Sequence, residues 1–372
     1  MGHGGSVAAR HRMNPTVAHV VGARPNFMKA APVIRALDAR ATGQRLIHTG
    51  QHYDARMSQV FFEDLGLPRP EVDLGVGSGS HAGQTAALMV ALEATFLASP
   101  PDLAMVYGDV NSTLAASLVA AKMGVPTAHV EAGLRSFDES MPEEVNRRVS
   151  DLLSDLLFVT SPEGVTNLAH MGVAPDRIHF VGNPMIDSVV ANLERFDPVR
   201  MRATLELPER YAVATIHRPS NVDDPDAAAR IATMLARVAE ALPLVVPLHP
   251  RSRPRLEATG LTSTDGLRLI EPLGYVDFLS LIRGAALVVT DSGGIQEETT
   301  FLGVPCLTVR DNTERPITIS HGTNRLVTPE SAPDAVADAL GRPRASGRMT
   351  PPLWDGHAGE RIAAVVAAWL TR

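Results

Sequence analysis

The chain lacks what several protein classes require. Cys306 is its only cysteine, which rules out an internal disulfide, and its apolar neighbours indicate a buried strand residue rather than a nucleophile. No run of 18 apolar residues is present, so a membrane-spanning helix has no support. A net charge of -7, without a basic patch carrying interleaved aromatic residues, argues against a general nucleic-acid binder. We expect neither nucleic-acid nor membrane partners.

Common signatures of bound nucleotides and zinc are also missing. No Gly-x-Gly-x-x-Gly follows a predicted strand and no Gly-x4-Gly-Lys-Ser/Thr occurs, so a tightly bound nicotinamide and a P-loop nucleotide both lose support. The histidines are scattered and do not have the spacing of zinc ligands. We therefore expect no metal and no organic cofactor.

The N-terminus gives no sign of an export signal. Residues 1–15 are rich in Gly, His and Arg and contain no apolar core. We interpret them as a disordered lead-in rather than a signal peptide. A cytoplasmic location is the resulting expectation.

Short apolar runs alternate with amphipathic stretches along nearly the whole chain. This rhythm predicts parallel sheets covered by helices, with strands at Val17–Val21, Arg45–Thr49, Leu103–Tyr107, Thr127–Val130, Leu156–Thr160, Ile178–Val181, Tyr211–Thr215, Leu244–Pro247, Leu267–Ile270, Ala286–Thr290 and Pro305–Val309. Helices are predicted at Phe27–Arg40, Thr113–Lys122, Glu143–Asp155 and about Asp187–Leu205.

A length of 372 residues exceeds what one core normally serves. We expect an α/β protein with two doubly wound domains, at residues 16–186 and 187–352, and a helix at 353–372 that can pack back on the first domain. In such sheets ligands bind beyond the carboxyl ends of the strands. Polar clusters follow seven predicted strands, beginning at Gly22, Gly50, Gly108, Glu131, His217, His249 and Asp291.

The segment from Ala286 to Glu298 has the pattern of a phosphate site. An apolar run breaks into Ser292, Gly293 and Gly294, where backbone N–H groups and the following helix N-terminus can meet an anion. Glu298 then lies one turn into the helix, within reach of sugar hydroxyls. The alternative is an ordinary strand-to-helix turn with glycines for tight packing.

Several acids stand where catalytic carboxylates are expected. Asp109 follows a strand and precedes a helix, so it is either a helix cap or a carboxylate at the cleft. Glu131 ends a strand before a flexible Ala-Gly, which favours a function. Glu143 and Glu144 lie in a first helical turn, where complementing the helix dipole is an equally good explanation.

Cationic groups complete the pattern. His217 ends a strand of the second domain and can hold a leaving phosphate or move a proton, unless it is an ordinary surface histidine. Arg24 precedes a helix bearing Lys29, one of only two lysines, and this pair suits a second grip on phosphates. Together these residues fit chemistry at a sugar carbon attached to a diphosphate.

At this point the sequence resembles the non-hydrolysing UDP-N-acetylglucosamine 2-epimerases. The resemblance is collinear from about residue 17 to 328 and lies in long segments: Gly22-Ala23-Arg24-Pro25 with Lys29, Gln51-His52, Gly108-Asp109, His129-Val130-Glu131-Ala132-Gly133-Leu134-Arg135, Pro142-Glu143-Glu144 with Asn146-Arg147, Gly182-Asn183, His217-Arg218, Asp291 to Glu298, and Arg310 to Pro316.

The resemblance implies a GT-B-like pair of Rossmann-type domains, usually a homodimer. It implies interconversion of UDP-GlcNAc and UDP-ManNAc by elimination of UDP to 2-acetamidoglucal and re-addition with inversion at C2. The implied acid/base and leaving-group residues are Asp109, Glu131, Glu143 and His217. The implied UDP or substrate contacts are Arg24, Lys29, Ser292, Gly293, Gly294, Glu298 and Arg315. An allosteric UDP-GlcNAc site is implied at Gln51, Gln84, Arg218 and His249.

Three positions depart from the pattern of that family. Asn26 and Ser220 stand where an acid is usual, and Ile317 follows Glu-Arg-Pro where Glu is common. No implied catalytic position is lost, but substrate tolerance and allosteric control become open. A GT-B glycosyltransferase, a hydrolysing epimerase that releases ManNAc and UDP, and a non-catalytic UDP-sugar sensor are the alternatives.

Overall fold

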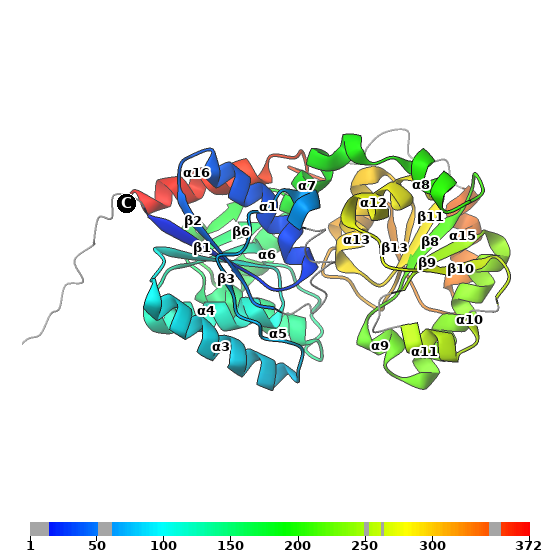
Figure 1. Ribbon diagram of the computed structural model, residues 1–372, viewed down its shortest axis with the longest axis horizontal. Coiled ribbons are helices and arrows are strands. Elements are labelled where there is room, and N and C mark those ends of the chain that lie inside the picture. The colour runs from blue at the N-terminus through cyan, green and yellow to red at the C-terminus, as the bar shows by residue number, and fades with distance from the viewer. Residues whose placement is uncertain (1–14, 51–61, 249–252, 262–263, 342–350) are drawn as a thin grey trace, which may run out of the picture.

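The computed structural model describes residues 15–50, 62–248, 253–261, 264–341 and 351–372. They form two lobes, each built on one parallel sheet (Figure 1). We call them the first lobe, which holds β1 to β7, and the second lobe, which holds β8 to β13. No helix in these ranges is long and apolar enough to cross a membrane.

The first lobe has a seven-stranded sheet in the order β3-β2-β1-β4-β5-β6-β7. Its strands are β1 (Thr16–Val21), β2 (Gly43–His48), β3 (Val72–Asp73), β4 (Leu103–Tyr107), β5 (Thr127–Ala132), β6 (Leu156–Val159) and β7 (Ile178–Phe180). In the middle, Val20 of β1 lies beside Ile47 of β2 and Val106 of β4. Every residue of β4 and β5 is buried, as expected for a parallel sheet covered on both faces.

Helices cover both faces of this sheet. One side carries α3 (His81–Ala98), α4 (Asn111–Met123) and α5 (Pro142–Leu153), which are neighbours in this order (Figure 1). The other side carries α1 (Arg24–Asp38), α7 (Pro184–Asn192) and α16 (Ala358–Leu370). The shorter α6 (Pro162–His170) and the 3-10 turn η1 (Pro175–Arg177) connect the last strands.

The second lobe repeats the architecture with six strands in the order β10-β9-β8-β11-β12-β13. These are β8 (Ala212–Thr215), β9 (Leu244–Pro247), β10 (Leu267–Ile270), β11 (Leu287–Thr290), β12 (Cys306–Val309) and β13 (Asn324–Val327). Its helices are α8 (Pro198–Thr204), α9 (Pro219–Val222), α10 (Pro225–Ala241), α11 (Arg253–Ala258), α12 (Tyr275–Gly284), α13 (Gly293–Leu302), α14 (Ile317–Ser320) and α15 (Ala332–Gly341). Cys306 is buried in β12, which confirms the prediction of a strand residue.

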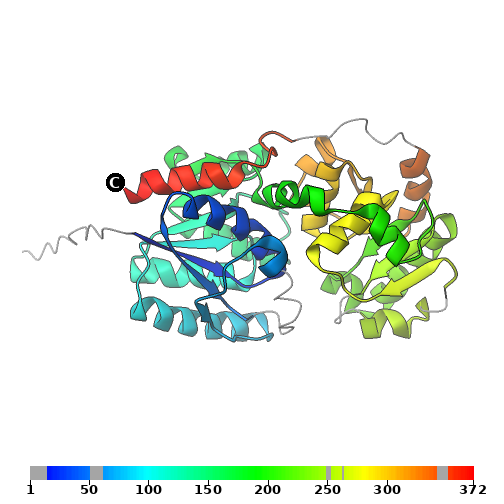
Figure 2. The same ribbon diagram turned by 45° about the horizontal axis from the view of Figure 1, so that its top comes forward.

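The chain passes between the lobes twice. It leaves the first lobe after α7 through the 3-10 turn η2 (Leu193–Arg195), and it returns after α15 to end in α16 (Figure 2). In the returning segment Trp354 is buried and donates from Nε1 to the carbonyl of Thr160 at 3.0 Å. The Asp187 carboxylate accepts from the Gly359 N–H at 2.7 Å, which holds the start of α16 against α7. The expected boundary between residues 186 and 187 falls inside α7.

Some secondary-structure predictions were wrong. The helix expected at Asp187–Leu205 is interrupted, because Pro198 starts a new helix that Asp197 caps through the Arg200 N–H at 2.9 Å. The helix expected to reach Asp155 ends at Leu153, since Asp155 bonds the backbone N–H of Thr127 instead. The short strands β3 and β13 were not predicted.

Each sheet reverses its strand order once, between β1 and β4 and between β8 and β11. At such a point neighbouring loops leave in opposite directions and open a crevice for ligands. Glu131 at the end of β5 and Arg147 of α5 contact Arg315 and Glu314, which follow β12 in the second lobe. The fold thus brings several candidate residues to the contact between the lobes.

Candidate active site

Glu131 has an unusual backbone at the end of β5. Its φ is 76°, in the left-handed region that a residue with a side chain rarely adopts. The register between β5 and β6 shifts at this residue, which marks a bulge. Strained conformations of this kind persist where the surroundings fix them, and they are frequent at functional sites. The bulge directs the buried carboxylate of Glu131 toward the second lobe.

Two cations hold the Glu131 carboxylate. Lys29 from α1 makes an ion pair with Oε2, and Arg315 from the second lobe donates to Oε1. Burial lowers the pKa of Lys29 to about 8, and the nearby Arg315 contributes to this shift. Lys29 and Arg315, both expected to bind substrate, therefore contact a candidate catalytic carboxylate in this structure.

Arg315 is also tied to carboxylates of its own lobe. Its Nε lies 3.0 Å from Oε1 of Glu297, and Nη1 pairs with Glu314. Gly293 is required at this point, because a Cβ on that residue would collide with the Arg315 guanidinium. The glycine thus has a packing role besides the expected approach to a phosphate.

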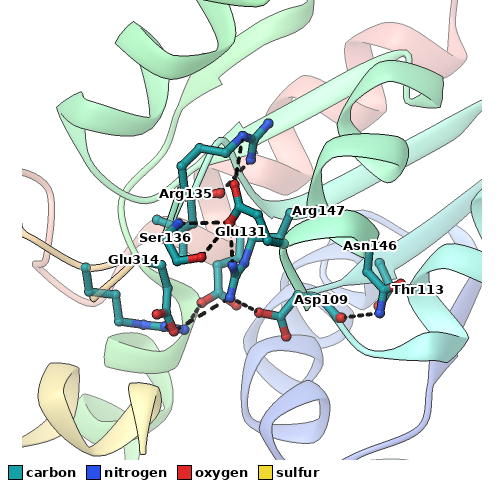
Figure 3. A network of polar contacts seen from close by, with 12 residues as sticks. Asp109, Thr113, Glu131, Arg135, Ser136, Asn146, Arg147 and Glu314 are labelled. Carbon is teal, nitrogen blue, oxygen red and sulfur yellow. Dashed lines mark hydrogen bonds and ion pairs between the residues drawn. The ribbon is translucent and has the colours of Figure 1, made fainter. Parts of the chain in front are cut away.

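Asp109 is held by Arg147 of α5 rather than by a helix end (Figure 3). Its Oδ2 accepts from Arg147 Nη2 at 2.6 Å, while the N-cap of α4 is Val110 and makes no side-chain capping bond. The capping explanation is therefore wrong. Burial opposes ionisation of Asp109, but Arg147, Lys29 and Arg315 outweigh it and lower the pKa of the carboxyl.

The two acids of the first turn of α5 differ in their surroundings. Glu144 is buried and accepts from the Ser136 N–H at 2.8 Å and from Arg147 Nη1 at 2.9 Å. Glu143 is half-buried, and its side chain makes no hydrogen bond or ion pair within the described part of the chain. Glu144 is thus a structural member of the network, whereas Glu143 is available to a ligand.

A network of charges joins the lobes beside these acids. The carboxylate of Glu314, buried in the second lobe, lies 3.7 Å from Arg147 of the first lobe and 2.7 Å from Arg310. Burial opposes ionisation of Glu314, but Arg315, Arg147 and Arg310 hold its pKa well below the usual value. Sequence reasoning included Arg147 and Glu314 in segments of family resemblance but assigned them no role.

His217 is oriented by a buried aspartate. Its Nδ1 lies 2.9 Å from Oδ1 of Asp291, while half of the His217 side chain is exposed. Asp291 is fixed by the backbone N–H groups of His217 and Arg218 and by Asn221 Nδ2. Burial opposes ionisation of Asp291, but His217 and these donors lower its pKa. A carboxylate that orients an imidazole is a common partner of a functional histidine, and Asp291 was the part of this pair that we had not predicted.

The expected phosphate segment lies beside His217. Ser292 is the N-cap of α13 without a side-chain capping bond, and Gly293 and Gly294 are partly exposed at the start of the helix. Glu298, one turn further, is buried, and burial together with Glu297 raises its pKa to about 8. Its Oε1 has no hydrogen-bond partner within the described ranges. Arg24 lies on the first lobe as the first residue of α1, partly buried.

Half of the predicted second site can be located. Gln84 is buried and donates to the Gly77 carbonyl at 2.9 Å, while its Oε1 accepts from Asn111. Arg218 donates from Nε to the Asp291 carbonyl at 3.0 Å. Gln51 and His249 lie outside the described residues.

Two of the three departures from the family pattern have visible surroundings. Asn26 is buried, accepts from the backbone N–H groups of Gly22 and Ala23, and donates to the Tyr107 carbonyl at 2.7 Å. An ionised acid could not make the last of these bonds. Ile317 is buried at the start of α14. Ser220 lies in α9 beside Asn221, which contacts Asp291.

Comparison with known proteins agrees with this geometry. Residues 35–367 match the family model of UDP-N-acetylglucosamine 2-epimerase. A Methanocaldococcus jannaschii UDP-N-acetylglucosamine 2-epimerase is 39% identical over 359 residues, covering 93% of this chain and 97% of the relative. A Pseudomonas aeruginosa UDP-2,3-diacetamido-2,3-dideoxy-D-glucuronate 2-epimerase is 40% identical over 313 residues, covering 83% and 87%.

The crystal structure of the M. jannaschii enzyme in complex with UDP-GlcNAc and UDP superposes with a TM-score of 0.89 at 38% identity, covering 95% of this chain and 99% of that one. The GT-B-like fold expected from the sequence is thereby confirmed. Family model, sequence identity and superposition all extend over most of the chain, which therefore belongs to the UDP-N-acetylglucosamine 2-epimerase family.

Proposed function

We propose that this chain interconverts UDP-GlcNAc and UDP-ManNAc. One observation carries the proposal: the first lobe holds the carboxylates of half-buried Asp109 and buried Glu131 in ion pairs, Arg315 of the second lobe reaches Glu131, and the second lobe orients His217 on Asp291 just before α13. The first lobe supplies groups for proton transfer at a sugar carbon. The second lobe supplies an imidazole and a helix N-terminus for a diphosphate.

The proposed reaction is an elimination followed by an addition. A carboxylate takes the proton from C2 while the bond between C1 and the phosphate oxygen breaks, and UDP leaves with the bonding electrons. UDP then adds to C1 of the 2-acetamidoglucal, and an acid returns a proton to C2 from the opposite face. Two acid/base groups on opposite faces are needed, and we assign them among Asp109, Glu131 and Glu143.

Departure of UDP carries much of the barrier, since no neighbouring carbonyl acidifies the C2 proton. Groups that stabilise the leaving phosphate therefore dominate. We assign this role to His217 and to the backbone N–H groups at Ser292, Gly293 and Gly294, with Arg24 as a further phosphate contact. Glu298, whose Oε1 has no partner in the described protein, is assigned to the ribose hydroxyls.

Lys29 and Arg315, which we expect to bind substrate, share one partner in this structure. Both contact the Glu131 carboxylate. We propose that they keep Glu131 in place and ionised for proton transfer, and that they reach the diphosphate only when substrate competes for them.

The reaction can be tested by proton NMR of the purified protein with UDP-GlcNAc in deuterium oxide. UDP-ManNAc carrying deuterium at C2 supports the proposal. Free UDP with ManNAc would instead identify a hydrolysing epimerase. An unchanged spectrum would contradict this assignment and favour a transferase, a sensor or another sugar.

The sugar itself has a second candidate. The P. aeruginosa relative is named for a UDP-sugar with two acetamido groups and a carboxylate, and its identity to this chain is as high as that of the M. jannaschii relative. The same NMR assay with that sugar separates the two cases. Higher kcat/KM on UDP-GlcNAc is the result that we expect.

We further propose that the protein is a homodimer and that α3 forms part of the interface. This helix is apolar on its exposed side, where 70% of Val90 and 68% of Leu97 is accessible, and Glu93 is its only acid. Exposed apolar patches of this kind mark interaction sites. Light scattering of the Val90→Glu/Leu97→Glu variant should show a monomer where the parent is a dimer. A monomeric parent would contradict the proposal.

Domain limits at 16–186, 187–352 and 353–372, an allosteric site that includes Gln84 and Arg218, and a cytoplasmic location stay predictions. Binding of UDP-GlcNAc at two stoichiometric sites per chain would support the allosteric site, and one site would contradict it.

A further inference from the structure

His129 lies two residues before Glu131 and is fully buried in β5. Its Nδ1 is 2.7 Å from Oδ1 of Asp151, and its Nε2 is 2.8 Å from the Gly108 carbonyl. A carbonyl oxygen can only accept, so Nε2 carries a proton. The Asp151 carboxylate also accepts, so Nδ1 carries the other. Both ring nitrogens are therefore placed to donate.

Asp151 is fully buried on α5 and uses both oxygens. Besides His129, it accepts from the Gly133 N–H at 3.1 Å and from Arg135 Nη2 at 2.6 Å. Burial opposes its ionisation, but His129 and Arg135 outweigh this effect and lower its pKa. Four hydrogen bonds thus fix the pair of His129 and Asp151.

These bonds end on the segments that carry the candidate carboxylates. Gly108 immediately precedes Asp109, and Gly133 follows Glu131 by two residues. Asp151 stands four residues after Arg147, which binds Asp109, and Arg147 stands four after Glu143. Residues at this spacing share one face of a helix. One face of α5 therefore carries Asp151, Arg147 and Glu143, while the Gly133 N–H connects Asp151 to the strand end of Glu131.

A second buried histidine of the same sheet, His19, has hydrogen-bond partners of a different kind. His19 in β1 is equally buried, and its nitrogens lie 2.6 Å from the Tyr107 hydroxyl and 2.8 Å from Gln44. Neither partner atom belongs to a loop of the cleft. His19 therefore provides a matched control for His129.

We propose that His129, together with Asp151, is a positioning residue that fixes the loops of Asp109 and Glu131 so that both carboxylates meet the sugar in their reactive places. This inference rests on the proposed epimerase activity. It assigns the pair no contact with substrate.

The test compares His129→Gln, Asp151→Asn, the double variant and His19→Gln. For His129→Gln and Asp151→Asn we expect kcat to fall about 100-fold, the scale of a small misplacement of catalytic groups, with KM and UDP affinity unchanged. The double variant should be no slower than the slower single variant, because the two residues act as a unit. His19→Gln should lower the melting temperature but keep kcat.

Near-normal kcat in folded His129→Gln, or a kcat loss equal to that of His19→Gln, would overturn the proposal. If His129→Gln does not fold, the double variant, in which amides replace both side chains, decides in the same way. Nitrogen-15 spectra of the histidine rings test the pair without turnover. Protons on both nitrogens of His129 in the parent, with one lost in Asp151→Asn, are expected, and a neutral ring in the parent would refute it. If the parent protein epimerises no UDP-sugar, the proposed function is wrong. The nitrogen-15 spectrum then still tests whether His129 and Asp151 interact as proposed.

Discussion

Arg315 of the second lobe donates to the carboxylate of Glu131 in the first lobe, 184 residues earlier in the chain. Both side chains are buried, and a second contact between the lobes, from Arg147 to Glu314, lies beside them. The site is therefore completed only when the two lobes meet. Several consequences can be measured.

Removing the charge of a candidate acid should abolish most turnover. For Asp109→Asn and Glu131→Gln we expect a decrease in kcat of at least ~100-fold, the scale of positioned acid/base catalysis, and little change in UDP affinity by calorimetry. Glu240→Gln, an exposed acid at the end of α10, is the control and should keep full activity. Near-normal turnover would remove the altered residue from the mechanism.

Arg315→Met should destabilise the protein strongly. It leaves Glu131, Glu297 and Glu314 without a buried cation, and breaking such a pair costs about 3–5 kcal/mol. Urea unfolding measures this loss. Arg237→Met removes an exposed pair with Asp334 and should cost less than about 1 kcal/mol. Equal losses in the two variants would show that Arg315 does not stabilise the buried carboxylates.

Glu298 should make stability fall as pH rises. Its folded pKa is about 8 against 4.5 in a model peptide, so the folded protein binds the proton more tightly between these values. The free energy of unfolding therefore does not change through this group below about pH 4.5. Between about pH 4.5 and pH 8 it decreases with rising pH, by at most about 1.4 kcal/mol per pH unit. Relative to wild type, Glu298→Gln should gain stability across this window. Parallel curves of the two proteins would contradict the raised pKa.

Gly359→Ala should loosen the returning helix. A Cβ at this position would lie 2.7 Å from the Pro32 carbonyl of α1, and such overpacking costs about 1–3 kcal/mol. At a helix position where a Cβ has no close neighbour, Gly→Ala would instead increase stability, because alanine favours helices. Gly341→Ala at the end of α15, where a Cβ meets nothing within 4 Å, is the control. Thermal unfolding that ranks the two variants equally would disprove the contact.

The local pattern of apolar and polar residues was sufficient to predict most strands, because parallel strands buried on both faces are continuous apolar runs. It was insufficient where a strand is short or half-exposed, as in β3 and β13, which take their pairing from neighbours. It also overestimated helix continuity at Pro198, where local chemistry ends one helix and starts another.

Similarly, the sequence singled out Lys29, Glu131 and Arg315, which the structure brings into contact. It did not predict the partner of each. Glu143 and Glu144 have the same local signal, and only the phase of α5 buries one of them. The pairing of Arg147 with Glu314 joins different lobes and leaves no trace in local spacing.

The second lobe is inserted between two parts of the first. Strands β1 to β7 and α7 precede it in the chain, whereas α16, which packs on α1 and α7, follows it. During synthesis the first lobe therefore waits for its last helix until the whole second lobe has been made. The groove that α16 fills on α1 and α7 should stay uncovered on the ribosome until then.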